Sequence, residues 1–452
     1  MPHRLSTISA EIFSVPLETG EYLIYAPKRR IAFVANSKTV NVVVAFKNAE
    51  HAKAEQYDKS TVEFLCKLGI FDDAYDSSHT FFPSPKRSEV SFDFLISSNS
   101  ETCCSYCDTN YASQICKTGI GRPMDLLIAR KGIDLLFECM KDLNRNTGSV
   151  NFHGVVDDKK CWSVLTDSMS YLQKKSSKSS FQIKSLITTR SFPQGINQIQ
   201  WMSQNLDSCS LIIEAGYKDS DIENGLGLRD ILDDVIVKTL ESFEKVLFPY
   251  ELTLALKNDQ VISLPDVVDL ILHYLRPQTI RIEPRYRFWG PWDGNPSSET
   301  VQFVHAFREC RARAMKSGIK VIFPGTELIA HTNFCGKDSG SFTLSPEGEL
   351  RICCGKHSES HFGNINVLIS DSTTSEETVT PTFRQLWVNH SNQVESRSYC
   401  KKCFAKFNCA GDCFESRTTE FKGSERCYVI RELTQDQLLD KIALSGGLFF
   451  KD

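Results

Sequence analysis

The stretch CKKCFAKFNCAGDC, residues 400–413, carries four cysteines separated by two, five and three residues. Gaps this short let one loop bring several sulfur atoms to a single metal centre. Cys335 and Cys353 precede this stretch, and Cys427 follows it. We therefore expect residues 326–452 to form a cysteine-rich domain that folds around bound metal.

Cysteine usage in the whole chain favours metal thiolates over disulfides. The 17 cysteines are odd in number, and most cluster at short spacings. Five others are scattered among apolar residues, where a cysteine usually acts as a small hydrophobe, and we assign them no function: Cys66, Cys139, Cys161, Cys209 and Cys310. Spacing alone leaves structural zinc open, because four thiolates suit tetrahedral zinc as well as an iron–sulfur cluster.

Between Cys335 and Cys353 the sequence FTLSPEGELRICC has Pro346 and Gly348 at its centre. Proline and glycine so close together mark a turn. The pattern predicts two short strands, the second of which carries Cys353 back towards Cys335.

Length and composition describe an ordinary globular protein of two or three units. The chain has 452 residues, 41% of them hydrophobic and 24% charged, and no apolar run approaches the length of a membrane span. The first twenty residues lack the apolar core of a signal peptide, so we expect a cytoplasmic protein. A net charge of -4 with mixed signs gives no basic stripe, which argues against nucleic acid as a partner.

Upstream of the cysteines, residues 89–325 alternate between short β-rich runs and amphipathic segments. This repeated order predicts parallel strands in an α/β fold, a partial (βα)6 TIM-like barrel. The six runs are SFDFLIS (91–97), SVNFHG (149–154), FQIKSLITT (181–189), SCSLIIE (208–214), YELTLAL (250–256) and TIRIEP (279–284). Residues 1–88 are expected to form a small N-terminal α+β unit, joined to the barrel by a linker rich in Ser and Pro.

The complete cysteine pattern, with Gly348 at its usual place, resembles the SPASM domain of radical SAM enzymes that modify peptides and proteins. The resemblance implies two auxiliary [4Fe–4S] clusters. The first would be held by Cys335, Cys353 and Cys413, and the second by Cys400, Cys403, Cys409 and Cys427. The first set lacks an evident fourth ligand, a place that Cys354 or a substrate group would fill.

In that family the first barrel strand ends in Cys-x3-Cys-x2-Cys, whose three thiolates leave one iron free for S-adenosylmethionine. Here Cys104 and Cys107 match the last two positions, but Ser100 occupies the first. A serine oxygen is a hard and rarely ionised ligand, whereas these irons favour thiolates. Cys103 is the candidate replacement, so a third cluster with S-adenosylmethionine would rest on Cys103, Cys104 and Cys107.

Other positions that contact the cofactor in the family are also altered. The Gly-Gly-Glu-Pro run that receives the amino group of S-adenosylmethionine is replaced by Val155, Val156 and Asp157, of which Asp157 keeps a carboxylate. Glu214 survives from the ending of the fourth strand. The resemblance thus implies Asp157 and Glu214 as cofactor-binding residues in a weakened site.

Two hypotheses follow from this resemblance. In the first, the chain is a radical SAM enzyme that modifies a ribosomally made peptide or protein and needs an electron donor. In the second, it is a catalytically degenerate subunit that binds the precursor peptide or supports an active radical SAM partner. Under either, the stretch EYLIYAPKRRIAFVAN (21–36) resembles the openings of some peptide maturases, which suggests a peptide-docking or cap role for residues 1–88.

Overall fold

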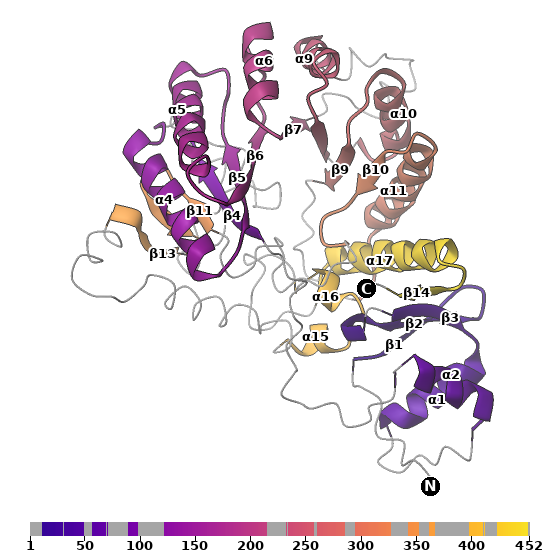
Figure 1. Cartoon of the computed structure of the whole chain (residues 1–452). Coiled ribbons are helices and arrows are strands. Elements are labelled where there is room, and N and C mark those ends of the chain that lie inside the picture. Colours follow the sequence, from indigo (N-terminus) through magenta and orange to yellow (C-terminus); the bar gives the residue numbers. More distant parts are fainter. Residues whose placement is uncertain are drawn as a thin grey trace.

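The computed structural model describes residues 11–29, 31–48, 57–68, 70, 89–97, 122–214, 232, 234–256, 260–284, 294–326, 342–351, 361–366, 397–409, 411 and 423–450. These are the described residues below, and every statement on structure refers to them. Figure 1 shows a curved parallel sheet with helices on its outer side and a smaller antiparallel sheet below it.

The small sheet combines both ends of the chain. Its strands run in the order β1-β2-β3-β14, with antiparallel pairing throughout. Strand β14 thereby joins the last residues of the chain to the first, a pairing that no local pattern signals. The elements of this part are β1 (Phe13–Pro16), β2 (Tyr22–Ala26), η1 (Pro27–Arg29), β3 (Ile31–Ala35), α1 (Ser37–Asn48), α2 (Lys59–Lys67) and β14 (Leu448–Phe450).

Both faces of the small sheet are buried, as the alternation along β2 shows. Ile24 and Ala26 pack into the core formed with α1 and α2. Leu23 and Tyr25 lie on the opposite face, since successive strand residues point to opposite sides, and they join the large core of the rest of the molecule. A strand buried on both faces reads as a continuous apolar run, which explains the sequence YLIYA.

The large sheet has ten strands in the order β10-β9-β8-β7-β6-β5-β4-β11-β12-β13, and β4 to β10 pair in parallel. The six predicted runs form β4 to β9. Strand β10 adds a seventh, shorter parallel strand that the sequence analysis did not include. The strands are β4 (Glu89–Leu95), β5 (Thr147–His153), β6 (Gln182–Thr189), β7 (Ser208–Glu214), β8 (Tyr250–Leu256), β9 (Thr279–Pro284) and β10 (Lys320–Ile322).

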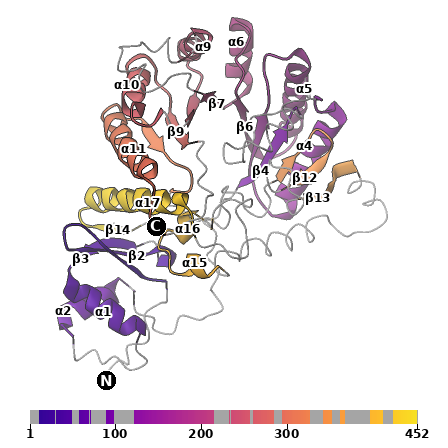
Figure 2. The same cartoon turned by 180° about the vertical axis from the view of Figure 1, so that it is seen from behind.

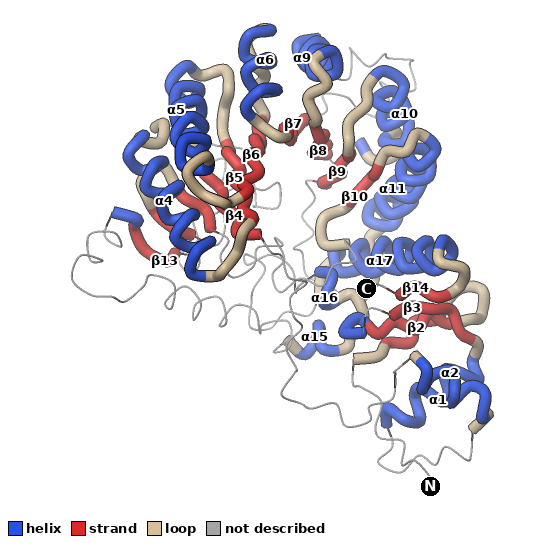
Figure 3. The backbone as a smooth tube through the Cα atoms, in the orientation of Figure 1, coloured by secondary structure: helices blue, strands red, loops and turns tan. Residues whose placement is uncertain are grey.

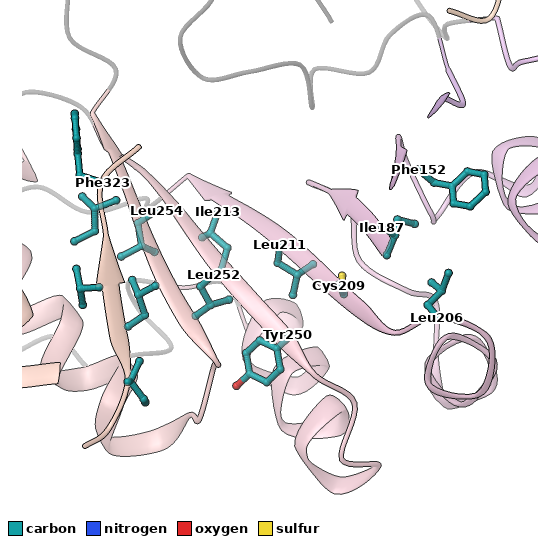
Figure 4. Close-up of a cluster of buried hydrophobic side chains, with 14 of the residues drawn as sticks. Phe152, Ile187, Leu206, Cys209, Leu211, Ile213, Tyr250, Leu252, Leu254 and Phe323 are labelled. Carbon is teal, nitrogen blue, oxygen red and sulfur yellow. The ribbon is translucent and has the colours of Figure 1, made fainter. Parts of the chain in front are cut away.

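Helices cover the convex face of this sheet (Figure 3). They are α4 (Leu126–Asp142), α5 (Lys159–Ser176), α6 (Ile196–Asn205), α9 (Asp234–Lys245), α10 (Leu264–Tyr274) and α11 (Ser298–Lys316). Beneath them the strands present large apolar side chains; Phe152, Ile187, Leu211 and Leu254 are fully buried and lie on the same face of the sheet (Figure 4). Burial of this layer is the main force that holds the barrel together.

The cysteine-rich region begins as an extension of the same sheet. Strand β11 (Phe342–Leu344) pairs in parallel with β4, β12 (Glu349–Arg351) is antiparallel to β11, and β13 (His361–Asn364) follows. The predicted pair of short strands around Pro346 and Gly348 is thus confirmed. Gly348 has a φ of +86°, a backbone conformation that favours glycine.

Three helices complete this region: α15 (Ser398–Lys401), α16 (Lys406–Cys409) and α17 (Glu425–Leu444). Helix α17 lies between α11 and the small sheet, as Figures 1 and 2 both show. Arg308 of α11 binds Asp436 of α17 with two hydrogen bonds of 2.7 and 3.1 Å and Glu432 with one of 2.8 Å. These ion pairs fix α17 against the last barrel helix.

No helix in the described part of the chain is both long and apolar enough to cross a membrane.

Candidate metal centre

Cys400, Cys403, Cys409 and Cys427 line one pocket. The first three lie in or beside α15 and α16, and the fourth lies in the first turns of α17. Tyr399, Lys406, Gly411 and Ile430 complete the lining. These are the four cysteines that the sequence analysis assigned to one cluster.

Consecutive tight turns bring the first three sulfurs together. The backbone N–H of Cys403 donates to the carbonyl of Cys400 at 2.9 Å, that of Lys406 to Cys403 at 3.3 Å, and that of Cys409 to Ala405 at 2.9 Å. Each turn reverses the chain within three or four residues, so the cysteines return to the same side. The short gaps in the sequence are therefore the cause of the convergence.

The electrostatics of the pocket combine burial with nearby positive charge. Burial raises the pKa of the Cys403 thiol, while the cations of Arg431 and Lys406 oppose that rise. At Cys427, the Ser424 hydroxyl donates to the sulfur at 3.6 Å, and Arg431 Nε donates to the Cys427 carbonyl at 3.2 Å. Positive charge and hydroxyl donors beside thiols favour the thiolate form, which is the form that ligates metals.

The donor set fits an iron–sulfur cluster. Four cysteine thiols around one pocket are the ligands of a [4Fe–4S] cluster, and the same four would suit zinc. Among the described residues, no three or more His, Cys, Asp or Glu side chains gather closely enough to bind one metal ion. The four sulfurs are spread around the pocket wall instead.

The sequence analysis missed two buried polar residues, Lys406 in the pocket wall and Asn408 next to Cys409 in the sequence. Lys406 has only 3% of its surface exposed, and its ammonium lies 3.0–3.1 Å from both carboxylate oxygens of Glu11. Asn408, 1% exposed, accepts a hydrogen bond of 3.5 Å from the Tyr25 hydroxyl. In the sequence, Lys406 looks like any surface lysine. Only the folded structure shows that it is buried and paired with Glu11.

The other predicted ligands lie outside the described residues: Cys103, Cys104, Cys107, Cys335, Cys353 and Cys413. Of the two predicted cofactor contacts, Asp157 is exposed in the segment between β5 and α5. Glu214 ends β7, where its backbone pairs with Ala255 of β8.

The segment between β5 and α5 packs against neighbouring residues and forms hydrogen bonds with them. Val156 is fully buried; its N–H donates to Ser191 Oγ at 2.6 Å, and its carbonyl accepts from Gln198 Nε2 at 3.5 Å. The next residue but one, Asp158, caps α5 by accepting from the N–H groups of Lys160 and Cys161 at 2.9 Å. The burial of Val156 and the cap formed by Asp158 thus hold both ends of this short segment in place.

The concave face of the large sheet carries a group of polar side chains. Strand registers place Asp93, Asn151, His153 and Thr188 on the side opposite the buried apolar side chains. Thr188 Oγ1 donates to Asn151 Oδ1 at 3.2 Å, Asn151 Nδ2 lies 2.9 Å from His153 Nε2, and that nitrogen lies 3.3 Å from Asp93 Oδ1. Three neighbouring strands thus carry a connected polar group where their carboxyl ends meet, the usual site of chemistry in a parallel barrel.

Glu283 adds a buried carboxyl group to the other side of the same face. It is 8% exposed, and burial raises its pKa, while Arg281, Arg426 and Arg190 oppose the rise. Arg426 itself is fully buried and lies 6.0 Å from the centre of the Phe323 ring. The concave face therefore carries ionisable side chains on both sides, which suits a polar or charged ligand.

Four of the five scattered cysteines are buried: Cys139, Cys161, Cys209 and Cys310. Burial raises the pKa of Cys139 and of Cys161 to about 12, so both are protonated near neutral pH. These thiols are unsuited to ligation or nucleophilic attack. Cys66 is the exception, since it is exposed.

Comparison with known proteins identifies solved structures with a similar fold. No protein-family model matches the sequence, and no curated protein matches it. Among solved structures, this chain is similar to anSMEcpe with bound AdoMet, an anaerobic sulfatase-maturating radical SAM enzyme. The TM-score is 0.52 at 13% sequence identity, and the match covers 78% of this chain and 98% of that chain. Native anSMEcpe with bound AdoMet and Kp18Cys peptide gives a TM-score of 0.53 at 11% identity, over 78% and 98%. At this identity the likeness shows the fold alone, a mixed α/β fold with a parallel central sheet.

Proposed function

We propose that this chain is an iron–sulfur protein of the radical SAM/SPASM type that acts in the post-translational modification of a ribosomally made peptide or protein. The observation that carries the proposal is the pocket lined by Cys400, Cys403, Cys409 and Cys427. A four-thiol pocket beside a barrel of the radical SAM type supports an auxiliary cluster. The solved neighbour with a bound peptide supports a peptide as the class of substrate.

In this proposal the described residues have separate tasks. The four cysteines hold a [4Fe–4S] cluster, which supplies electron transfer or a binding point for substrate. The polar concave face, with Asp93 and His153 at one end and Glu283 at the other, binds and orients the peptide and provides groups that accept or donate a proton. Cys335, Cys353 and Cys413 would hold a second auxiliary cluster, and Cys103, Cys104 and Cys107 would hold the cluster that binds S-adenosylmethionine.

The test is anaerobic reconstitution followed by reduction with dithionite in the presence of S-adenosylmethionine. We expect 5'-deoxyadenosine, measured by mass spectrometry, and its loss in the variant Cys104→Ala/Cys107→Ala. A reconstituted chain that contains iron and sulfide but yields no 5'-deoxyadenosine, with or without candidate peptides, overturns the enzymatic function.

The second candidate is a degenerate subunit that binds the precursor peptide or supports an active radical SAM partner. The observation that favours it is Val156, which stands where the family has a glycine. Its side chain is fully buried, and both of its backbone polar groups are bonded to Ser191 and Gln198. A buried valine side chain at this place prevents the close approach to the backbone that a glycine would permit.

Calorimetry of the reconstituted chain with S-adenosylmethionine distinguishes the two candidates. The degenerate subunit predicts no binding of S-adenosylmethionine but retained binding of peptide or of a partner enzyme in a pull-down. Binding of S-adenosylmethionine at micromolar affinity would contradict it.

A further inference from the structure

The buried ion pair between Lys406 and Glu11 joins the small sheet to the cysteine pocket. Lysine is rarely so fully buried unless it is paired. Here the ammonium contacts both oxygens of Glu11 at 3.0–3.1 Å and lies 4.8 Å from the centre of the Phe407 ring and 5.9 Å from that of Phe13. Glu11 lies two residues before the start of β1, and the two partners are 395 residues apart in the chain.

The position of Lys406 brings its charge to the thiols. It lies in the sequence between Cys403 and Cys409 and lines the same pocket, and its cation lowers the pKa of Cys403 against the effect of burial. With so little water around it, the charge is poorly screened.

A second lysine, Lys47, interacts electrostatically with the Glu11 carboxylate. Lys47 Nζ donates to the carbonyl of Ile12 at 2.8 Å and lies 5.5 Å from the centre of the Phe13 ring. Burial lowers the pKa of Lys47, Glu11 opposes this change, and the charge of Lys406 adds to it. Glu11 therefore attracts two cations, Lys47 and Lys406. Its negative charge offsets part of the electric field that Lys406 exerts on the pocket.

We propose that Lys406 is a positioning residue whose charge makes a cluster held by Cys400, Cys403, Cys409 and Cys427 easier to reduce, and that Glu11 limits this effect. The inference rests on the proposed function, because it needs an iron–sulfur cluster in this pocket. A [4Fe–4S] cluster with four thiolates carries two net negative charges, and one electron from a donor such as dithionite adds a third without making or breaking a bond. A buried cation stabilises the more negative, reduced form more than the oxidised form.

The experiment is a redox titration followed by electron paramagnetic resonance on the full chain reconstituted anaerobically. To isolate one cluster, it is repeated with the other array cysteines replaced by serine: Cys103, Cys104, Cys107, Cys335, Cys353 and Cys413. For Lys406→Met we expect the ratio of reduced to oxidised cluster at a fixed potential to fall about tenfold, which equals ~59 mV for one electron. Glu11→Gln should shift the potential in the opposite direction.

Three further variants separate charge from structure. Lys406→Arg keeps the positive charge and should restore the wild-type potential. Glu11→Gln/Lys406→Met removes both charges, leaves no buried carboxylate unpaired by the substitution, and should lower the potential less than Lys406→Met alone. Lys175→Met, which removes a lysine paired with Asp134 between the barrel helices α5 and α4, should leave the potential unchanged.

The outcomes distinguish the inference from the function beneath it. A wild-type chain that takes up no iron and sulfide overturns the proposed function. A chain that holds the cluster but shows the same potential in wild type, Lys406→Met and the double variant overturns the inference. A potential that falls in Lys406→Arg as far as in Lys406→Met also overturns it, because it assigns Lys406 a purely structural role.

Discussion

Gly132 of α4 lies where the barrel meets the cysteine-rich region, and replacing it with alanine tests that contact. A Cβ atom at this position would lie 2.4 Å from Leu344 Cδ2 of β11 and 2.7 Å from Phe94 Cε1 of β4. Both distances are far below an ordinary van der Waals contact, so the neighbours would have to shift. Gly132 is buried in the middle of a helix, where glycine is otherwise unfavourable.

Two opposing effects set the magnitude. Alanine in place of glycine stabilises a helix interior by ~1 kcal/mol. Extra volume in a packed core costs about 1–3 kcal/mol. Because two of the contacts are shorter than 3 Å, we expect the steric cost to dominate and Gly132→Ala to lower the free energy of unfolding by about 1–2 kcal/mol.

The assay is urea unfolding of the metal-free chain followed by circular dichroism, with a cycle through Leu344→Ala. Leu344→Ala alone should cost about 2–5 kcal/mol, because it leaves a cavity. In that background the clash with Leu344 is gone and only the one with Phe94 remains, so Gly132→Ala should cost less than it does in the unaltered chain. If Gly132→Ala raises the free energy of unfolding of the unaltered chain by ~1 kcal/mol, only the higher helix propensity of alanine is felt. That result would refute the packing described between α4, β4 and β11.

Three further predictions concern other contacts. Arg308→Met removes the ion pairs between α11 and α17 and should cost ~1 kcal/mol at low salt and less at high salt, as unfolding at two ionic strengths would show. Asp158→Ala removes the α5 cap and should cost ~1 kcal/mol near neutral pH. The hydrogen bond from the Cys161 backbone lowers the pKa of Asp158 in the folded chain. The stability that the cap contributes is therefore present above the usual carboxyl pKa and is lost as the pH falls through the lower folded-state pKa. Without this carboxylate, the stability of the variant should depend less on acid pH than that of the unaltered chain. Gly423→Ala would place a Cβ 2.4 Å from the ring of the tyrosine that lines the pocket and should reduce iron retained after reconstitution, whereas Gly446→Ala, also at positive φ but with nothing within 4 Å, should not.

The sequence was informative wherever a local pattern determines structure. Alternation of β-rich and amphipathic segments predicted the six strands β4 to β9, because each strand presents a continuous or alternating apolar face to its covering helices. Pro346 and Gly348 predicted the turn between β11 and β12 for a similarly local reason, since the turn needs a residue at positive φ.

The family resemblance implied one set of four thiols, Cys400, Cys403, Cys409 and Cys427, and these four line one pocket in the structure. The first three lie close together because the short gaps between them form consecutive tight turns. Cys427 was grouped with them through the family resemblance alone. The assignments of the remaining array cysteines stay predictions.

Long-range contacts were not predictable from the sequence. The pairing of β14 with β3 joins segments more than four hundred residues apart, and three residues of β14 carry no signal for a partner. Burial of Lys406 escaped prediction for the same reason, because its partner Glu11 comes from the opposite end of the chain. The polar row of Asp93, Asn151 and Thr188 becomes evident only once the strand registers are known.

The central claim is that Cys400, Cys403, Cys409 and Cys427 hold a [4Fe–4S] cluster. Iron and sulfide analysis with Mössbauer spectroscopy, on the reconstituted chain whose other array cysteines are replaced by serine, tests it most directly. The account predicts about four irons and four sulfides per chain in a cubane spectrum, lost when Cys403→Ser is added. One zinc ion per chain in place of iron, or iron uptake that Cys403→Ser leaves unchanged, would contradict it.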